Sequence, residues 1–137
     1  MRATKWACLV LVLVGTSVFA DGDKALEGKW QVVSITKSGA ADATWTDAIR
    51  EHTGDKYTMA KAGGKSVTGT MKVDAAKKTI DTMPAEGTYK GKTLLGIYEV
   101  EGDTLKICFA EPGKDRPTKI ASSADSGTTV AVYKKVK

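Results

Sequence analysis

The 137-residue sequence contains no asparagine, one histidine and two cysteines. Without asparagine it offers no acceptor for an N-linked glycan. His52 is the single histidine, and one of the two cysteines, Cys8, lies in the N-terminal segment described below, which leaves Cys108 alone. One histidine and one cysteine are too few for a zinc site built from these residues, and a lone cysteine cannot form an intramolecular disulfide. We therefore expect no metal and a fold held by side-chain packing and backbone pairing.

The sequence also lacks an apolar run long enough to cross a bilayer, which takes ~20 residues. Its longest such run, residues 6–14, follows Arg2 and Lys5 and precedes Val18-Phe19-Ala20, which ends in a small residue. This is the pattern of a secretory signal peptide over residues 1–20. We expect cleavage after Ala20, no membrane span in the cleaved chain, and a secreted or periplasmic location. An uncut N-terminal anchor is the alternative.

A strong charge of either sign is missing as well. Removal of residues 1–20 takes away two basic residues, Arg2 and Lys5, and lowers the formal net charge from +5 to +3. The remaining basic residues are scattered, apart from a cluster at residues 134–137 that is typical of a solvated terminus. This balance does not favour nucleic acid as a partner. Contact of the terminal cluster with anionic lipid or polysaccharide is the alternative.

We expect a polar leader at residues 21–25 and one domain at residues 26–137. In that domain, short runs rich in Val, Ile, Thr and Tyr alternate with turns of Gly, Asp and Lys, which is typical of β-strands. We predict strands at residues 29–37, 55–61, 66–73, 78–83, 93–101, 104–111, 117–121 and 128–136. The pattern predicts an all-β protein, a small antiparallel up-and-down β-barrel of about eight strands. A β-sandwich is the main alternative.

The clearest hairpin turns at Gly102-Asp103, a dipeptide suited to a two-residue loop. This turn places Glu101 opposite Thr104 and Gly96 opposite Phe109, so that Gly96 leaves room for the phenylalanine ring. One face of the hairpin is then the core face, with Tyr98, Val100, Leu105, Ile107 and Phe109. The other face carries Leu95, Ile97 and Cys108, which is too apolar for a bare outer wall. We expect another element or a partner protein to cover it.

One helix is predicted, over residues 44–52 between the first and second strands. Thr44 suits the N-cap, Asp47 follows three residues later as in a capping box, and Gly54 suits the end. The apolar stripe of this helix is formed by Trp45, Ala48, Ile49 and His52. A helix at this place would lie across one opening of the barrel as a lid.

Motifs for catalysis are absent or incomplete. Gly64-Lys65-Ser66 and Gly91-Lys92-Thr93 resemble the end of a phosphate-binding loop, but Met59 and Glu86 stand where the first glycine is needed. There is no Gly-x-Ser-x-Gly motif and no second histidine. We therefore expect no enzyme, no catalytic residues and no cofactor. A glycosidase acting on envelope carbohydrate through two carboxylates is the least favoured alternative.

The segment Leu26-Glu27-Gly28-Lys29-Trp30 is similar to the Gly-x-Trp signature of lipocalins, in which the tryptophan packs at the closed end of the barrel. Residues 26–34, 91–99, 102–108 and 116–118 resemble a family of uncharacterised, often secreted, lipocalin-like domains expanded in planctomycete bacteria. The resemblance implies a small antiparallel β-barrel and carries no established activity. Lipocalins pair this tryptophan with an arginine of the last strand, where this chain has only Lys134 and Lys135.

Two functions are compatible with such a barrel. The first is binding of a small apolar or amphipathic ligand in the barrel mouth, with Trp45, Ile49 and Tyr98 as its wall and Trp30 packed at the barrel base. The second is an interaction or structural domain of the cell envelope that uses the patch of Leu95, Ile97 and Cys108. The sequence leaves the ligand, the partner and the oligomeric state open.

Overall fold

The computed structural model describes residues 23–137, so the signal segment predicted at residues 1–20 lies outside the described residues. One turn of 3₁₀ helix, η3 (Lys24–Leu26), precedes a sheet of nine strands. The strands are β2 (Gly28–Lys37), β3 (Ala40–Ala41), β4 (Ile49–Thr53), β5 (Lys56–Ala60), β6 (Ser66–Asp74), β7 (Thr79–Pro84), β8 (Leu94–Glu101), β9 (Thr104–Ala110) and β10 (Thr128–Lys135).

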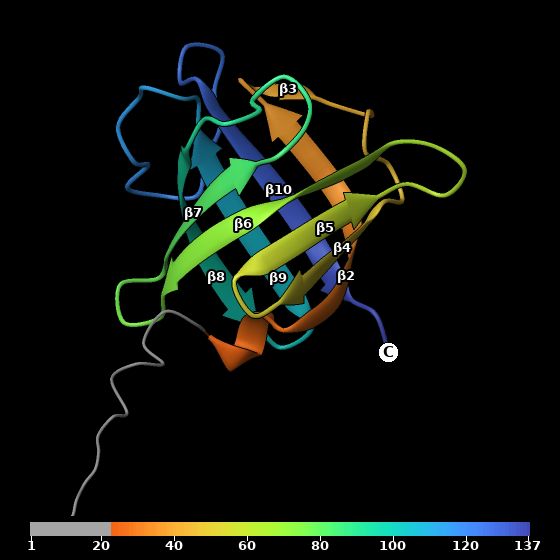
Figure 1. The fold of residues 1–137 in the computed structure, drawn as a ribbon. Coiled ribbons are helices and arrows are strands. Elements are labelled where there is room, and N and C mark those ends of the chain that lie inside the picture. The colour runs from red at the N-terminus through yellow and green to blue at the C-terminus, as the bar shows by residue number, and fades with distance from the viewer. Residues whose placement is uncertain (1–22) are drawn as a thin grey trace, which may run out of the picture.

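The strands form a closed antiparallel barrel (Figure 1). From β4 to β10 each strand pairs with the next along the chain, and β2 pairs with both β4 and β10. The closing pair runs from Thr129 opposite Lys37 to Lys135 opposite Trp30. β3 pairs with the last two residues of β2 and is not one of the eight strands of the closed barrel. The prediction of an all-β, up-and-down barrel of eight strands is therefore confirmed.

The predicted hairpin at Gly102-Asp103 has the predicted register, from Glu101 opposite Thr104 to Gly96 opposite Phe109. A β-carbon on Gly96 would lie 2.9 Å from the Phe109 ring and 2.9 Å from the carbonyl oxygens of Cys108 and Ile80. Gly96 is therefore needed for a close approach of ring and backbone, as the sequence indicated. The inner face of the hairpin packs in the core as predicted.

The predicted helix over residues 44–52 is wrong: residues 44–47 form a turn and β4 begins at Ile49. Asp47 has φ of 62°, in the left-handed region that a right-handed helix excludes. From residue 48 burial alternates with a period of two, which is the period of a strand. Backbone pairing with β2 on one side and β5 on the other outweighs the local helical pattern.

The strand predicted at residues 117–121 is also absent, because segment 111–127 runs as a loop over the outside of the barrel. Cys108 Sγ donates to the carbonyl oxygen of Ala121 at 3.6 Å. Arg116 fastens the loop through a two-pronged ion pair with Asp81 and a 2.8 Å hydrogen bond to the Gly96 carbonyl. The chain itself thus covers the outer apolar face.

Because this loop covers the outer apolar face, the prediction of a partner patch at Leu95, Ile97 and Cys108 needs correction. Cys108 has no exposed surface, so it cannot contact a partner, and Leu95 and Ile97 are half-buried. The large hydrophobic side chains that are exposed among residues 23–137 are Val33, Met83 and Val136, which do not belong to that patch.

The barrel is closed at the end next to η3. Leu26 is buried there, and Trp30, also buried, donates from Nε1 to the Leu26 carbonyl oxygen at 3.0 Å. Lys135 Nζ lies 4.7 Å from the centre of the Trp30 ring and donates to the Glu27 carbonyl oxygen. A lysine of the last strand therefore covers the tryptophan from outside, by a cation–π contact and a hydrogen bond.

We expect Gly96→Ala to destabilise the barrel by about 1–3 kcal/mol, because the new methyl group meets two backbone oxygens and an aromatic ring. The matched control is Gly64→Ala in a hairpin turn, where a β-carbon would meet nothing within 4 Å. Urea denaturation followed by circular dichroism measures both. Equal unfolding midpoints for the two variants would contradict the close approach at Gly96.

Candidate ligand-binding site

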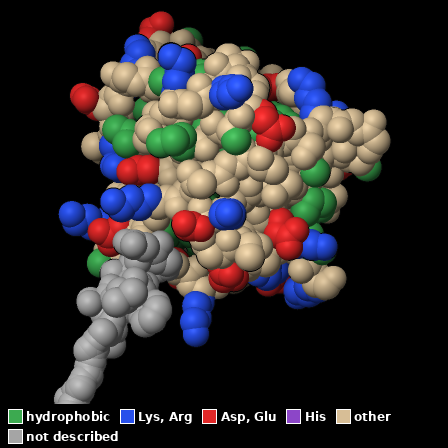
Figure 2. Space-filling view, in the orientation of Figure 1, with side chains coloured by type: hydrophobic (Ala, Val, Ile, Leu, Met, Phe, Trp, Pro, Cys, Tyr) green, Lys and Arg blue, Asp and Glu red, His purple; other side chains and the backbone are tan. Residues whose placement is uncertain are grey.

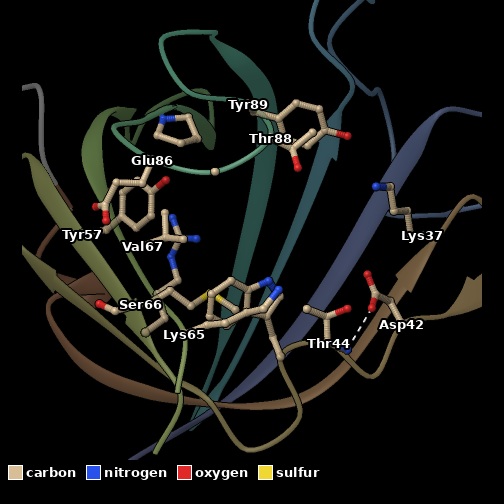
Figure 3. A pocket seen from close by; sticks show the side chains of 15 residues that line it. Lys37, Asp42, Thr44, Tyr57, Lys65, Ser66, Val67, Glu86, Thr88 and Tyr89 are labelled. Carbon is tan, nitrogen blue, oxygen red and sulfur yellow. Dashed lines mark hydrogen bonds between the residues drawn. The ribbon is translucent and has the colours of Figure 1, made fainter. Parts of the chain in front are cut away.

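The end of the barrel away from η3 is open. A cavity of about 600 Å³ opens between the ends of β2, β5, β6 and β7 and the loops that follow β3 and β7 (Figure 3). It is lined by Lys37, Asp42, Thr44, Trp45, Arg50, Tyr57, Met59, Lys65, Ser66, Val67, Pro84, Glu86, Gly87, Thr88 and Tyr89. Its wall therefore mixes apolar and aromatic side chains with charged ones.

Two carboxylates of this cavity are held by the chain's own donors. Glu86 accepts hydrogen bonds from Thr68 Oγ1 at 2.7 Å and Thr68 N at 3.0 Å, which lower its pKa. Asp42 accepts from the Thr44 backbone N–H at 2.9 Å, and hydrogen bonds from Thr44 hold its pKa below the usual range. Both carboxylates are thus ionised at neutral pH, and Figure 3 shows them on opposite sides of the cavity.

Arg50, on β4, lines the cavity although its side chain is buried, with only 4% of its surface exposed. Its Nε donates to Nε2 of His52 at 2.7 Å, and its guanidinium carbon lies 4.2 Å from the centre of the Tyr57 ring. Its Nη2 has no hydrogen-bond partner among residues 23–137. In the same part of the chain no aspartate or glutamate forms an ion pair with Arg50.

His52 lies below Arg50, toward the closed end, and is 1% exposed. Its Nδ1 is 2.9 Å from the Leu26 carbonyl oxygen. Because Nε2 accepts from Arg50, the proton of the neutral ring is on Nδ1, which donates to Leu26. Burial, together with the charge of Arg50, lowers the pKa of His52 to about 3. His52 is therefore neutral at pH 7.

Tyr57 supplies the flat surface against which Arg50 lies. A β-carbon at position 69 would lie 2.7 Å from Tyr57 Cε1 and 2.9 Å from the Tyr57 hydroxyl oxygen. Gly69, opposite Tyr57 on β6, therefore makes room for this ring. Burial raises the pKa of Tyr57, so its hydroxyl keeps its proton and can donate a hydrogen bond.

Comparisons with protein-family models, with curated proteins and with solved structures found no match for this chain. The resemblance to planctomycete lipocalin-like domains therefore stays a prediction. Within residues 23–137 no cluster of three or more His, Cys, Asp or Glu side chains could hold a metal ion. In the same range, no helix has the length and apolar character needed to cross a membrane.

The predicted wall residues are only partly brought together. Trp45 lines the cavity, but Ile49 and Tyr98 do not. Ile49 precedes Arg50 on a strand, so it faces the opposite side of the sheet. Tyr98 lies toward the closed end, where its hydroxyl donates to Asp23 Oδ2 at 2.5 Å. Asp23, predicted as part of a leader, is thereby joined to the barrel.

Sequence reasoning missed Arg50, Tyr57 and Met59 as cavity residues. The signal that could have found them is alternation: Ala48, Arg50 and His52 are two residues apart, as are Tyr57 and Met59 on a strand that was predicted correctly. An inward arginine is an unusual choice for a barrel interior, because a buried charge needs compensation.

Figure 2 shows basic and acidic side chains interspersed over the visible face, with no large area of one sign. This agrees with the low net charge of the sequence. The unusual charged group among residues 23–137 is therefore Arg50, which is buried inside the barrel and does not lie on this face.

We expect the stability of the protein to fall as the pH drops from about 6.5 toward 3, partly because of His52. Its pKa is about 3 in the folded state against 6.5 ordinarily, so only the unfolded chain takes up this proton between those values. His52→Gln should reduce the loss of unfolding free energy between pH 7 and pH 4.5 by roughly 2–3 kcal/mol, at about 1.4 kcal/mol per pKa unit. Denaturation at both pH values measures it. An identical loss in wild type and variant would contradict the buried neutral ring.

Proposed function

We propose that this protein is an exported binding protein that takes up a small amphipathic ligand in the cavity. The observation that carries the proposal is the cavity at one end of a barrel whose other end is packed. At about 600 Å³ the cavity falls within the range of about 300–1,000 Å³ that small-molecule sites occupy. Mouths of β-barrels are among the places where such sites recur.

The size of the ligand follows from what fills the other half. Trp30, Tyr98, Leu105 and Ile107 are buried and belong to one core cluster. They leave the mouth end as the route into the barrel. The ligand must therefore be small enough to lie between the mouth and Arg50.

The amphipathic character follows from the wall. Trp45, Met59, Val67 and Tyr89 present apolar or aromatic surface to the cavity. Lys37, Lys65, Asp42 and Glu86 add charged groups to the same cavity. A ligand with both an apolar and a polar part satisfies both kinds of group, whereas a purely apolar one would strip water from the polar groups without replacing it.

The lowered pKa values of the two cavity carboxylates favour ligand binding over glycoside hydrolysis. A glycosidase needs one carboxylic acid whose pKa is raised so that it can protonate the leaving group. The pKa values of Asp42 and Glu86 are both lowered by their hydrogen bonds. Neither suits the role of general acid.

The proposal of export rests on the signal pattern of residues 1–20. We expect the protein isolated from the envelope or medium of a producing bacterium to lack residues 1–20 and to begin at Asp21. Intact-mass spectrometry measures this directly. A mass that corresponds to the full 137-residue chain would overturn cleavage and favour an uncut anchor.

A cavity-filling variant tests binding. We expect Val67→Trp, whose larger side chain occupies the cavity, to lower the affinity for the neutral fluorescent probe N-phenyl-1-naphthylamine at least tenfold. The matched control is Val33→Trp on β2, where the side chain is 61% exposed. Fluorescence titration measures the affinity of each purified protein. Binding that is equal in both variants would place the probe outside the barrel.

A further inference from the structure

Arg50 presents to the cavity a positive charge that no carboxylate among residues 23–137 balances. Its side chain is only 4% exposed, Nη2 is buried without a hydrogen-bond partner, and no carboxylate among residues 23–137 pairs with it. A buried charge is costly unless a counter-charge or hydrogen bonds compensate for it. The cation–π contacts with Tyr57, at 4.2 Å, and Phe109, at 5.8 Å, supply only part of that compensation.

The acidic groups of the same cavity form hydrogen bonds with other residues and not with Arg50. Glu86 is bonded to Thr68, and Asp42 to Thr44. His52 cannot serve either, because it is uncharged and its Nε2 is already the acceptor for Arg50 Nε. No acidic group among residues 23–137 therefore supplies the counter-charge of Arg50.

We infer that Arg50 binds the carboxylate of an amphipathic acid whose apolar part extends past Trp45 toward the mouth. This inference rests on the proposed function and names its ligand class. The Nε side of the guanidinium is taken by His52, which leaves the edge formed by the two Nη atoms for the ligand. That edge can donate two parallel hydrogen bonds to the two oxygens of a carboxylate.

A single negative charge fits this position better than two. Arg50 is the buried basic residue of the described chain, whereas the other basic side chains of the cavity, Lys37 and Lys65, are exposed. A phosphate monoester carries close to two charges at pH 7, so one of them would remain without a partner beside Arg50. The protonated hydroxyl of Tyr57 adds a neutral donor, which suits a carboxylate without adding charge.

The direct test compares ligands of equal chain length and different headgroups on the unaltered protein. Decanoate, decanol and decyl phosphate each compete with N-phenyl-1-naphthylamine for the cavity at pH 7.5. We expect decanoate to bind roughly ten- to a hundredfold more tightly than decanol, because a charge-assisted hydrogen bond is added. We also expect decanoate to bind more tightly than decyl phosphate.

Two variants assign the preference to Arg50. In Arg50→Met the ratio of decanoate affinity to decanol affinity should fall close to one, and in Arg50→Lys it should be intermediate, because the charge stays and the paired donors are lost. Lys29→Met, on the outer side of β2, removes one positive charge away from the cavity and should keep the wild-type ratio. Thermal unfolding confirms that each variant is folded.

The outcomes separate this inference from the proposed function. If the probe binds and decanol competes as well as decanoate, the carboxylate site is overturned and the binding barrel stands. A preference for decanoate that survives Arg50→Met but is lost in Lys37→Met or Lys65→Met would place the anion at the mouth and also overturn it. Tighter binding of decyl phosphate than of decanoate would overturn the inference that the ligand carries a single negative charge. If neither the probe nor any competitor binds, the proposed function itself fails.

Discussion

The carbonyl oxygen of Leu26 accepts two hydrogen bonds, from Trp30 Nε1 and from His52 Nδ1. The closed end of the barrel and the floor of the cavity both depend on this one acceptor. It fixes Trp30 at the closed end, and it fixes the position of the proton on His52. With Nδ1 protonated, Nε2 is free to accept from Arg50, which sets the orientation of the guanidinium. The closed end and the floor of the cavity are therefore parts of one hydrogen-bonded chain.

This chain divides the interior into two halves of different chemistry. Below Arg50 the barrel is filled by buried aromatic and aliphatic side chains, as expected for strands of five to ten residues. Above it the loops after β3 and β7 leave the interior open. The two halves are continuous, because Tyr57 and Met59 line the cavity and also belong to the buried core cluster.

The sequence predicted the barrel because its strands are marked locally. The turn at Gly102-Asp103 sets a register that involves only neighbouring residues, and the structure has that register. Residues 48–52 are different, because they satisfy both a helical period, through Ala48, Ile49 and His52, and a strand period, through Ala48, Arg50 and His52. Only pairing with β2 and β5 decides between the two, and β2 is about twenty residues away.

The cavity itself was less accessible to prediction. Trp45 was placed in its wall for a reason that proved wrong, since it lies in a turn and not on a helix. Arg50 was overlooked because a charged residue inside a barrel contradicts the general rule for interiors. Its position makes sense only when its neighbours His52 and Tyr57 are seen together, and these come from different strands. Alternation along one strand shows that Arg50 faces inward, but it does not show which residues of the next strand lie beside it.

The closure of the barrel by β2 and β10 has a consequence for the order of folding. The two strands lie at opposite ends of the chain, so the edge of β2 has no partner until residues 128–135 are present. Contacts between such distant segments are slow to form, and an unpaired edge invites wrong pairing with other chains. During synthesis the barrel cannot close before its last strand is released. A chain with this topology therefore stays open until residues 128–135 can pair with β2.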